Sequence, residues 1–170
     1  MDGNLINCMG MAAENVMNRP VSGLSRNSDD FVPEDEKGFR EHMLQNSFNA
    51  VWHSQIYFCD WDMFWSSHAE NRQNAVLRAV SGGPVYISDP VGETDPEVIL
   101  PLIRADGTVI RCDGVGMPTL DCLFENAASG GKALKLFNRY GENYVVAAFS
   151  MGEEKSVRAG IRLSDLPGTG

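Results

Sequence analysis

The segment Gln55–His68, QIYFCDWDMFWSSH, decides the fold class that the sequence predicts. It begins with an apolar run, Ile56–Cys59, and then changes abruptly to Asp60-Trp61-Asp62. A short, continuous apolar run is typical of a parallel strand that is buried on both faces. In barrels and open α/β sheets, ligands bind at the carboxyl ends of such strands. The segment therefore predicts a buried strand that ends at a site for a polar ligand.

A purely structural role explains the same residues without a ligand. Asp60 would then cap the following helix, and Asp62 would pair with a buried arginine. Trp61 and Phe64 would belong to the hydrophobic core, where large apolar side chains are usually found. Taken alone, the segment favours this structural role.

The composition limits the class of protein. The 170 residues suggest one domain, or one domain and part of a second. Apolar residues make up 43% and charged residues 22%, which is an ordinary globular composition. The net charge of −9 argues against nucleic acid and membrane as partners, because anionic surfaces attract clustered Lys and Arg. No apolar run reaches the roughly 18 residues that a membrane span needs.

The cysteines and the first residues carry no targeting or metal-binding signal. The four cysteines are scattered, and none forms a pair with metal-ligand spacing. We expect free thiols, as in a reducing compartment, and no metal or other cofactor. Residues 1–4 begin neither a basic region nor a long apolar core, so the sequence predicts no signal peptide and a cytoplasmic location.

The first hundred residues alternate short apolar runs with helical patterns. Strands are predicted at residues 5–9, 21–25, 56–59 and 84–87. Helices are predicted over 33–53 and 69–80, with Gly82 ending the second and Asp95-Pro96 starting another. His42 is expected on the solvent side of the 33–53 helix. Strands that alternate with helices indicate a parallel sheet.

After about residue 104 the pattern changes to β-type runs. Strands are predicted over 108–112, 132–138, 144–151 and 157–163, and Asp106-Gly107 is a turn signal. We therefore predict an α/β unit over residues 1–104 and a run of antiparallel strands over residues 105–170, which is short for a self-contained sandwich of about seven strands.

About four βα units are half of a closed (β/α)8 barrel, which takes roughly 250 residues. The sheet is therefore either a small open one or part of a longer polypeptide. A half-barrel would have two unpaired apolar edges.

Polar clusters follow the four predicted strands. They are Asn7–Met9, Arg26–Asp30, Asp60–Met63 and Ser88-Asp89. Parallel strands would bring these clusters to one rim. Carboxylates and aromatic rings at such a rim suit a sugar, because acids accept hydrogen bonds from hydroxyls and an indole packs on the C–H face of a ring. An ion-pair network that closes the rim, or a calcium or magnesium site, remains an alternative.

The clusters and their flanks resemble one known family. The resemblance lies in Arg26–Phe31 (RNSDDF), Cys59–Phe64 (CDWDMF), Arg78–Asp89 (RAVSGGPVYISD), Asp106-Gly107, Arg111, Pro118-Thr119 and Leu134–Asn138 (LKLFN). In this order, and over nearly the whole chain, the sequence resembles the raffinose synthase and seed-imbibition protein family. These proteins are α-galactosidases and galactosyl transferases of glycoside hydrolase family thirty-six.

The resemblance implies a (β/α)8 catalytic barrel followed by a C-terminal β-sandwich. The chain would supply barrel strands five to eight, and the missing N-terminal half would belong to the same polypeptide. The implied mechanism is retaining and uses two aspartates. The nucleophile of the family stands in a Lys-x-Asp motif, which this sequence does not contain. The implied substrate is an α-galactoside oligosaccharide.

The resemblance also implies roles for single residues. Asp29 matches the general acid/base best, and Asp30 is its adjacent competitor. Arg26 matches an arginine that contacts a galactose hydroxyl. The other substrate-binding candidates are Met9, Asp60, Trp61, Asp62 and Met63, of which Asp62-Met63 resembles a pair that lines the sugar pocket. Ser88-Asp89 is expected at the rim or in a structural role.

Two functions are consistent with these residues. The first is an α-galactoside hydrolase or galactosyl transferase, of which this chain carries the acid/base half. The second is a non-catalytic carbohydrate-binding or structural remnant of such a barrel. The sequence does not separate hydrolysis from transfer, because that depends on whether water or a sugar reaches the glycosyl-enzyme. An isolated half-barrel is expected to be inactive and to aggregate or partly unfold.

Overall fold

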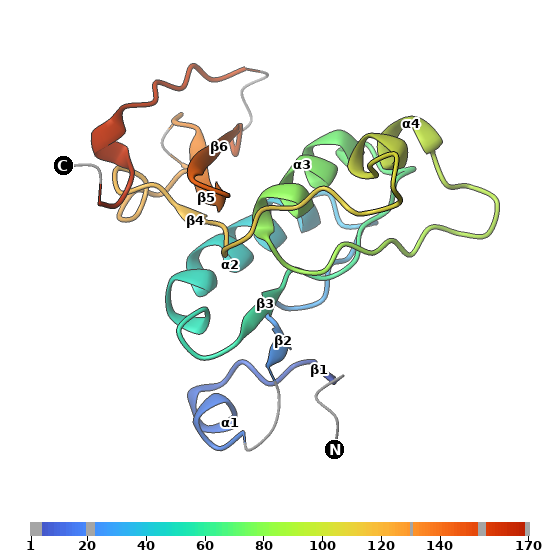
Figure 1. The fold of residues 1–170 in the computed structure, drawn as a ribbon, viewed down its shortest axis with the longest axis horizontal. Coiled ribbons are helices and arrows are strands. Elements are labelled where there is room, and N and C mark those ends of the chain that lie inside the picture. Colours follow the sequence, from blue (N-terminus) through green and yellow to red (C-terminus); the bar gives the residue numbers. More distant parts are fainter. Residues whose placement is uncertain (1–4, 20–22, 130, 153–155, 169–170) are drawn as a thin grey trace.

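A computed structural model describes residues 5–19, 23–129, 131–152 and 156–168. The first part of the chain forms β1 (Ile6–Asn7), α1 (Ala13–Met17), β2 (Leu24–Arg26), α2 (Gly38–His53), β3 (Phe58–Asp60), α3 (Asn71–Ser81), α4 (Pro96–Ile99) and the 3₁₀ helix η1 (Leu100–Leu102). The second part forms β4 (Met117–Pro118), β5 (Leu134–Tyr140), β6 (Asn143–Phe149) and the 3₁₀ helix η2 (Leu163–Asp165). Each part has one three-stranded sheet (Figure 1).

The first sheet is parallel, with the order β1-β2-β3. Its register places Leu24 between Ile6 and Phe58, and it places Arg26 beside Asp60. Beyond β3, Phe64 and Ile87 form a single parallel bridge, so the predicted 84–87 strand contributes one pairing. The prediction of a strand over residues 21–25 falls partly on residues 21 and 22, which lie outside the described residues. Residues 1–4, on which the signal-peptide prediction depends, also lie outside them.

The two faces of the parallel sheet differ in exposure. Ser25 and Cys59 occupy one row of the register and are buried. Helix α2 packs against β3, and Cys59 belongs to the core cluster. In the neighbouring row, Ile6 is 46% and Phe58 62% exposed. One face of the parallel sheet is therefore covered, and the other face is open at the row of Ile6 and Phe58.

Helix α2 differs from its prediction at two points. It begins at Gly38 rather than at Pro33, because the amides of Asp35 and Gly38 bind the carbonyls of Val32 and Asp35 in successive turns. His42 was predicted on the solvent side and is buried. The prediction was wrong because His42 lies on the helix face that meets Arg78 of α3, which donates a hydrogen bond to its ring.

Helix α3 ends as predicted. Its last residue is Ser81, and Gly82 follows with φ +76°, the left-handed conformation that favours glycine at a helix end. The start of α4 is also confirmed, because the Asp95 side chain accepts a hydrogen bond from the Glu97 amide. Within the described residues, no helix is both long enough and apolar enough to cross a bilayer.

The second sheet is antiparallel, with the order β4-β5-β6. The strands predicted over 132–138 and 144–151 are observed as β5 and β6. The 108–112 prediction is reduced to one antiparallel bridge, Ile103 to Val109. The 157–163 prediction was wrong: this segment forms no strand, and the Gly160 carbonyl binds the Lys135 ammonium instead of a strand.

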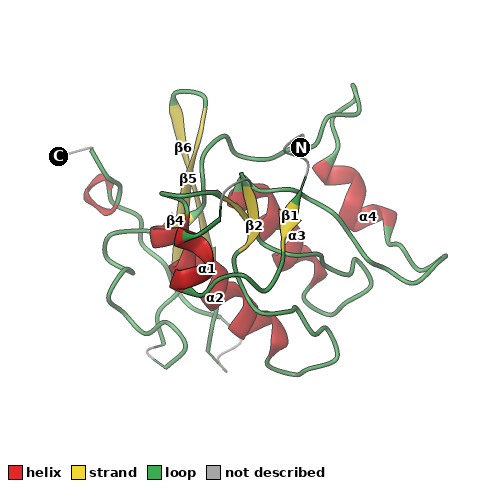
Figure 2. Ribbon diagram, turned by 90° about the horizontal axis from the view of Figure 1, so that it is seen from below, coloured by secondary structure: helices red, strands yellow, loops and turns green. Residues whose placement is uncertain are grey.

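The two parts of the chain meet at the end of α3. The Asn138 side-chain amide of β5 donates to the Val80 carbonyl at 2.6 Å, and the Gly116 amide donates to the Ser81 carbonyl at 2.9 Å. Helix α3 also packs against β6. The β5–β6 hairpin and α4 lie on opposite sides of the molecule (Figures 1 and 2).

Candidate functional site

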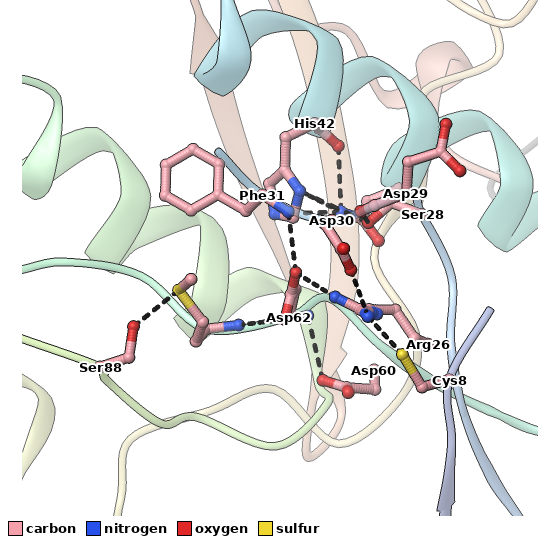
Figure 3. A network of polar contacts seen from close by, with 12 residues as sticks. Cys8, Arg26, Ser28, Asp29, Asp30, Phe31, His42, Asp60, Asp62 and Ser88 are labelled. Atoms are coloured by element: carbon pink, nitrogen blue, oxygen red, sulfur yellow. Dashed lines mark hydrogen bonds and ion pairs between the residues drawn. The ribbon is translucent and has the colours of Figure 1, made fainter. Parts of the chain in front are cut away.

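Polar side chains gather where the parallel strands end (Figure 3). Arg26 is the last residue of β2, and Asp60 is the last residue of β3, its partner in the register. Cys8 directly follows β1. Because the strands run in the same direction, these ends meet at one edge of the sheet, as the sequence predicted.

Arg26 is the centre of this cluster. Its Nη1 lies 2.5 Å from Asp62 Oδ2, and its Nη2 lies 2.5 Å from Asp30 Oδ1. The guanidinium also hydrogen-bonds the Cys8 sulfur. Burial acts to lower the pKa of Arg26, but the hydrogen bond with Cys8 and the charge of Asp62 outweigh it, so the pKa is raised. Arg26 therefore remains a fixed positive charge.

Asp62 has little freedom left. It is buried, and its backbone is left-handed, with φ +67°. Its carboxylate accepts hydrogen bonds from Arg26, from the Phe31 amide at 2.9 Å and from the Met63 amide at 2.9 Å. The alternative in which Asp62 pairs with a buried arginine is thus confirmed. A sugar hydroxyl that reached Asp62 would meet an acceptor whose orientation is fixed in advance.

Asp60 is buried directly behind this turn. Its Oδ1 accepts from the Asp62 amide at 3.0 Å, and its Oδ2 accepts from the Tyr86 hydroxyl at 2.9 Å. Burial raises the pKa of Asp60, and these two hydrogen bonds act against that rise. Asp60 does not cap a helix, because the next helix, α3, begins at Asn71 with Glu70 in the cap position. That part of the structural interpretation was wrong.

Asp29 and Asp30 point in different directions (Figure 3). The Asp30 carboxylate faces Arg26, although its side chain is 62% exposed. The Asp29 carboxylate points away from Arg26 and accepts a long hydrogen bond, 3.4 Å, from the Gln45 amide. Of these two neighbouring acids, the structure brings Asp30 to the cluster and leaves Asp29 at the exposed edge.

The remaining predicted site residues lie at different depths. Met9 follows Cys8, is 72% exposed and has φ +56°. Met63 is half-buried, and its sulfur accepts a hydrogen bond from the Ser88 hydroxyl. Trp61 is fully buried in the hydrophobic core, as is Phe64, which confirms the core alternative for both. Asp89 binds the amide and hydroxyl of Ser66.

Sequence reasoning missed Cys8 as a member of the cluster. It lies in the Asn7–Met9 segment that follows the first strand, so its position carried a signal, but its residue type did not suggest a bond to an arginine. One cavity of about 780 Å³ is lined by Arg104, Arg111 and Tyr140, among others, and not by Arg26 or Asp62. Among the described residues, no three potential metal ligands are grouped to hold an ion.

A family model described as "Raffinose synthase or seed imbibition protein Sip1" matches residues 1–153. The chain belongs to the raffinose synthase and seed imbibition protein family. This is the family that the sequence motifs around Arg26, Asp62 and Asp89 resembled.

Three relatives show how the chain compares with members of the family. It is 32% identical, over 99% of its length, to "Probable galactinol–sucrose galactosyltransferase 6" of Arabidopsis thaliana, of which it covers 24%. It is 39% identical, over 75% of its length, to a galactinol–sucrose galactosyltransferase of Oryza sativa subsp. japonica, of which it covers 17%. It is 42% identical, over 64% of its length, to a stachyose synthase of Pisum sativum, of which it covers 13%. The chain thus spans less than a quarter of the length of these relatives.

Proposed function

We propose that the chain is the second half of the (β/α)8 catalytic barrel of a galactosyltransferase, followed by the start of a β-sandwich. The parallel order β1-β2-β3 and the further bridge from Phe64 to Ile87 support the barrel. The names of two relatives, galactinol–sucrose galactosyltransferases, support transfer of a galactosyl group from galactinol to sucrose. Because the chain spans under a quarter of those relatives, the activity belongs to the complete polypeptide.

The open face of the sheet supports the same proposal. Ile6 and Phe58 share one row of the register and are largely exposed, although both are apolar. In a closed barrel this row would face the interior and pack against the residues of the other strands. The rest of the barrel would also supply the missing walls of a pocket around Arg26.

The ion pair between Arg26 and Asp62 at the strand ends is the observation that supports this function most directly. A guanidinium and a carboxylate held 2.5 Å apart present a donor and an acceptor side by side, and neighbouring hydroxyls of a hexose offer the complementary pair. The acceptor oxygens of Asp62 are shared with backbone amides, so its role is to bind and orient the sugar rather than to exchange a proton.

Asp29 is the candidate for the general acid/base. Its neighbour Asp30 is bound by Arg26, whereas Asp29 is exposed and receives a single long hydrogen bond from Gln45. Asp60 has the raised pKa that suits a general acid, but it is buried and bound by Tyr86. Asp29 is therefore the acid in this group that no arginine or buried partner holds, and its exposed carboxylate would have to turn from Gln45 toward Arg26 to reach a bound sugar.

The proposed reaction is a double displacement with retention. A nucleophilic carboxylate from another part of the polypeptide attacks the anomeric carbon, while Asp29 protonates the departing glycosidic oxygen. Asp29 then removes a proton from the hydroxyl of the acceptor sugar, which attacks the glycosyl-enzyme and restores the free nucleophile. The two carboxyl groups should lie about 5–5.5 Å apart in the complete barrel.

The test compares Asp29→Asn with Asp30→Asn in the complete polypeptide, with galactinol as donor and sucrose as acceptor. Asp29→Asn should lower the transfer rate about 10²- to 10⁴-fold, the usual contribution of a positioned acid/base. Glu36→Gln, an exposed acid in the turn before α2, is the matched control and should keep the wild-type rate.

The other outcomes are equally informative. A large loss in Asp30→Asn together with a normal rate in Asp29→Asn would assign the role to Asp30. Release of free galactose without transfer to sucrose would indicate a hydrolase. Complete absence of both reactions in the wild-type polypeptide would overturn the proposal in favour of a non-catalytic remnant.

A further inference from the structure

Arg78 of α3 lies next to the candidate site, where it contacts helix α2 and the turn that follows β3. It is fully buried. Its Nη2 donates one hydrogen bond to His42 Nε2 at 2.8 Å and another to the Met63 carbonyl at 2.9 Å. One guanidinium group therefore connects helix α2, helix α3 and the turn that follows β3.

Burying this cation is costly. Within the described residues, Nε and Nη1 of Arg78 have no hydrogen-bond partner, and an unsatisfied buried donor destabilises a fold. Burial lowers the pKa of Arg78 to about 10, while the charges of Asp62 and Asp60 act to raise it. Arg78 therefore stays charged at neutral pH, and its two hydrogen bonds, to His42 and to the Met63 carbonyl, offset part of the cost of burying the charge.

The Met63 carbonyl is the more informative of its two partners. Met63 directly follows Asp62, whose left-handed backbone is a conformation that persists when surrounding contacts hold it. Asp60 Oδ1 binds the amide on one side of the turn, and Arg78 binds the carbonyl on the other. The first contact fixes the peptide group that precedes Asp62, and the second fixes the peptide group that follows Met63, so the two contacts bracket the Asp62–Met63 turn.

The second partner leads to the same carboxylate. His42 accepts the Arg78 hydrogen bond at Nε2, which requires a neutral ring, and burial beside Arg78 lowers its pKa well below the ordinary value. The His42 ring packs against Phe31, with 4.9 Å between ring centroids. The Phe31 amide in turn donates to Asp62. Arg78 therefore supports Asp62 by two routes.

We propose that Arg78 is a positioning residue of the galactosyl-transfer site. It holds the Asp62–Met63 turn through the Met63 carbonyl, and it holds the Phe31 amide through His42. Together these contacts keep the Asp62 carboxylate against Arg26, where the sugar is bound. This inference rests on the proposed function, because it assigns Arg78 to the same site.

The first test measures transfer kinetics in the complete polypeptide. Arg78→Met removes both hydrogen bonds and the charge at similar length, and it should lower kcat about 10²-fold, the scale expected for a misplaced binding group. Arg78→Lys keeps the charge and one donor, and it should restore part of kcat. Leu77→Ala is the control, because Leu77 is also fully buried on α3, so this variant should lower the melting temperature without lowering kcat.

The second test does not depend on activity. A crystal structure of the Arg78→Met polypeptide should show Asp62 outside the left-handed region and separated from Arg26. If Arg78→Met does not fold, the same measurement on Arg78→Lys should show a displaced Met63 carbonyl. An unchanged turn, or a kcat equal to that of Leu77→Ala, would overturn the positioning role. A wild-type polypeptide without transfer activity but with a displaced turn in Arg78→Met would instead contradict the proposed function alone.

Discussion

Asp62 and Asp30 contact the same arginine, but their surroundings differ. Asp62 is buried and accepts three hydrogen bonds, two of them from backbone amides. Asp30 makes its ion pair with a side chain that is 62% exposed. A buried, multiply bonded carboxylate contributes far more to stability than an exposed ion pair, which is worth about 0–1 kcal/mol.

Asp62→Asn should therefore destabilise the fold by about 1.5–3 kcal/mol, because it removes a charged acceptor from buried donors. Asp30→Asn should cost no more than about 1 kcal/mol. Denaturant unfolding of the complete polypeptide and of both variants measures the difference. Equal losses of unfolding free energy in the two variants would show that the buried hydrogen bonds of Asp62 contribute no more to stability than the exposed ion pair of Asp30.

His42 should make stability depend on pH. Burial and the neighbouring Arg78 lower its pKa well below 6.5 in the folded state, while the unfolded chain keeps the ordinary value. Between these two values the unfolded state binds the extra proton, so stability should fall as the pH drops below about 6.5. His53, whose pKa burial also lowers, should add to the same trend.

Histidine NMR titration of the complete polypeptide measures this effect at each ring. The His42 signals should not titrate between pH 8 and about 6.5, and the comparison of His42→Gln with His53→Gln should separate the two contributions to stability. A His42 midpoint at or above the ordinary value would mean that the ring is not held as a neutral acceptor for Arg78.

At the scale of elements, the sequence predicted the end of α3 better than the start of α2. The residue after α3 has a positive φ, which glycine adopts without steric cost. Gly82 therefore marks the end of α3 in the sequence itself. The start of α2 was misplaced because Pro33 and the acids after it suit a turn as well as a first helical turn. Residues 157–163 have the alternating pattern of a strand but do not form one. The Gly160 carbonyl in this segment accepts a hydrogen bond from the Lys135 side chain instead of from a neighbouring strand.

Gly82→Ala should destabilise the protein by more than about 1 kcal/mol. A Cβ there would lie 1.7 Å from the Gly114 carbonyl oxygen, and the backbone is left-handed. Gly160→Ala is the matched control, since its Cβ would meet nothing within 4 Å and its φ is not positive. Thermal melting of both variants measures the contrast. Similar melting temperatures would mean that the end of α3 adjusts freely to the second part of the chain.

At the scale of the whole molecule, the sequence predicted parallel strands whose ends share one edge. It placed Arg26 and Asp62 together correctly, because topology alone brings the strand ends to one rim. It could not show that the Asp29 and Asp30 carboxylates point apart, and it left open whether Trp61 is buried in the core or faces a ligand. Those features depend on local backbone direction and on packing between distant segments, which a single sequence does not reveal.

The isolated 170-residue chain should aggregate or remain partly unfolded. Its parallel sheet has an open face with exposed Ile6 and Phe58, and unpaired strand edges promote association. Co-expression with the remainder of the barrel should yield a soluble complex. Light scattering and thermal melting measure both states. A cooperative melt of a monomer of this chain at micromolar concentration would contradict the half-barrel proposal.

We propose that these strand ends form the acid/base side of a retaining galactosyl-transfer site. The most direct measurement is azide rescue of Asp29→Gly in the complete polypeptide, with an aryl α-galactoside whose leaving group needs no acid. Azide needs no base, so it should attack the glycosyl-enzyme and restore turnover, giving α-galactosyl azide. Turnover that azide does not change, or a β-galactosyl azide product, would contradict the assignment of Asp29.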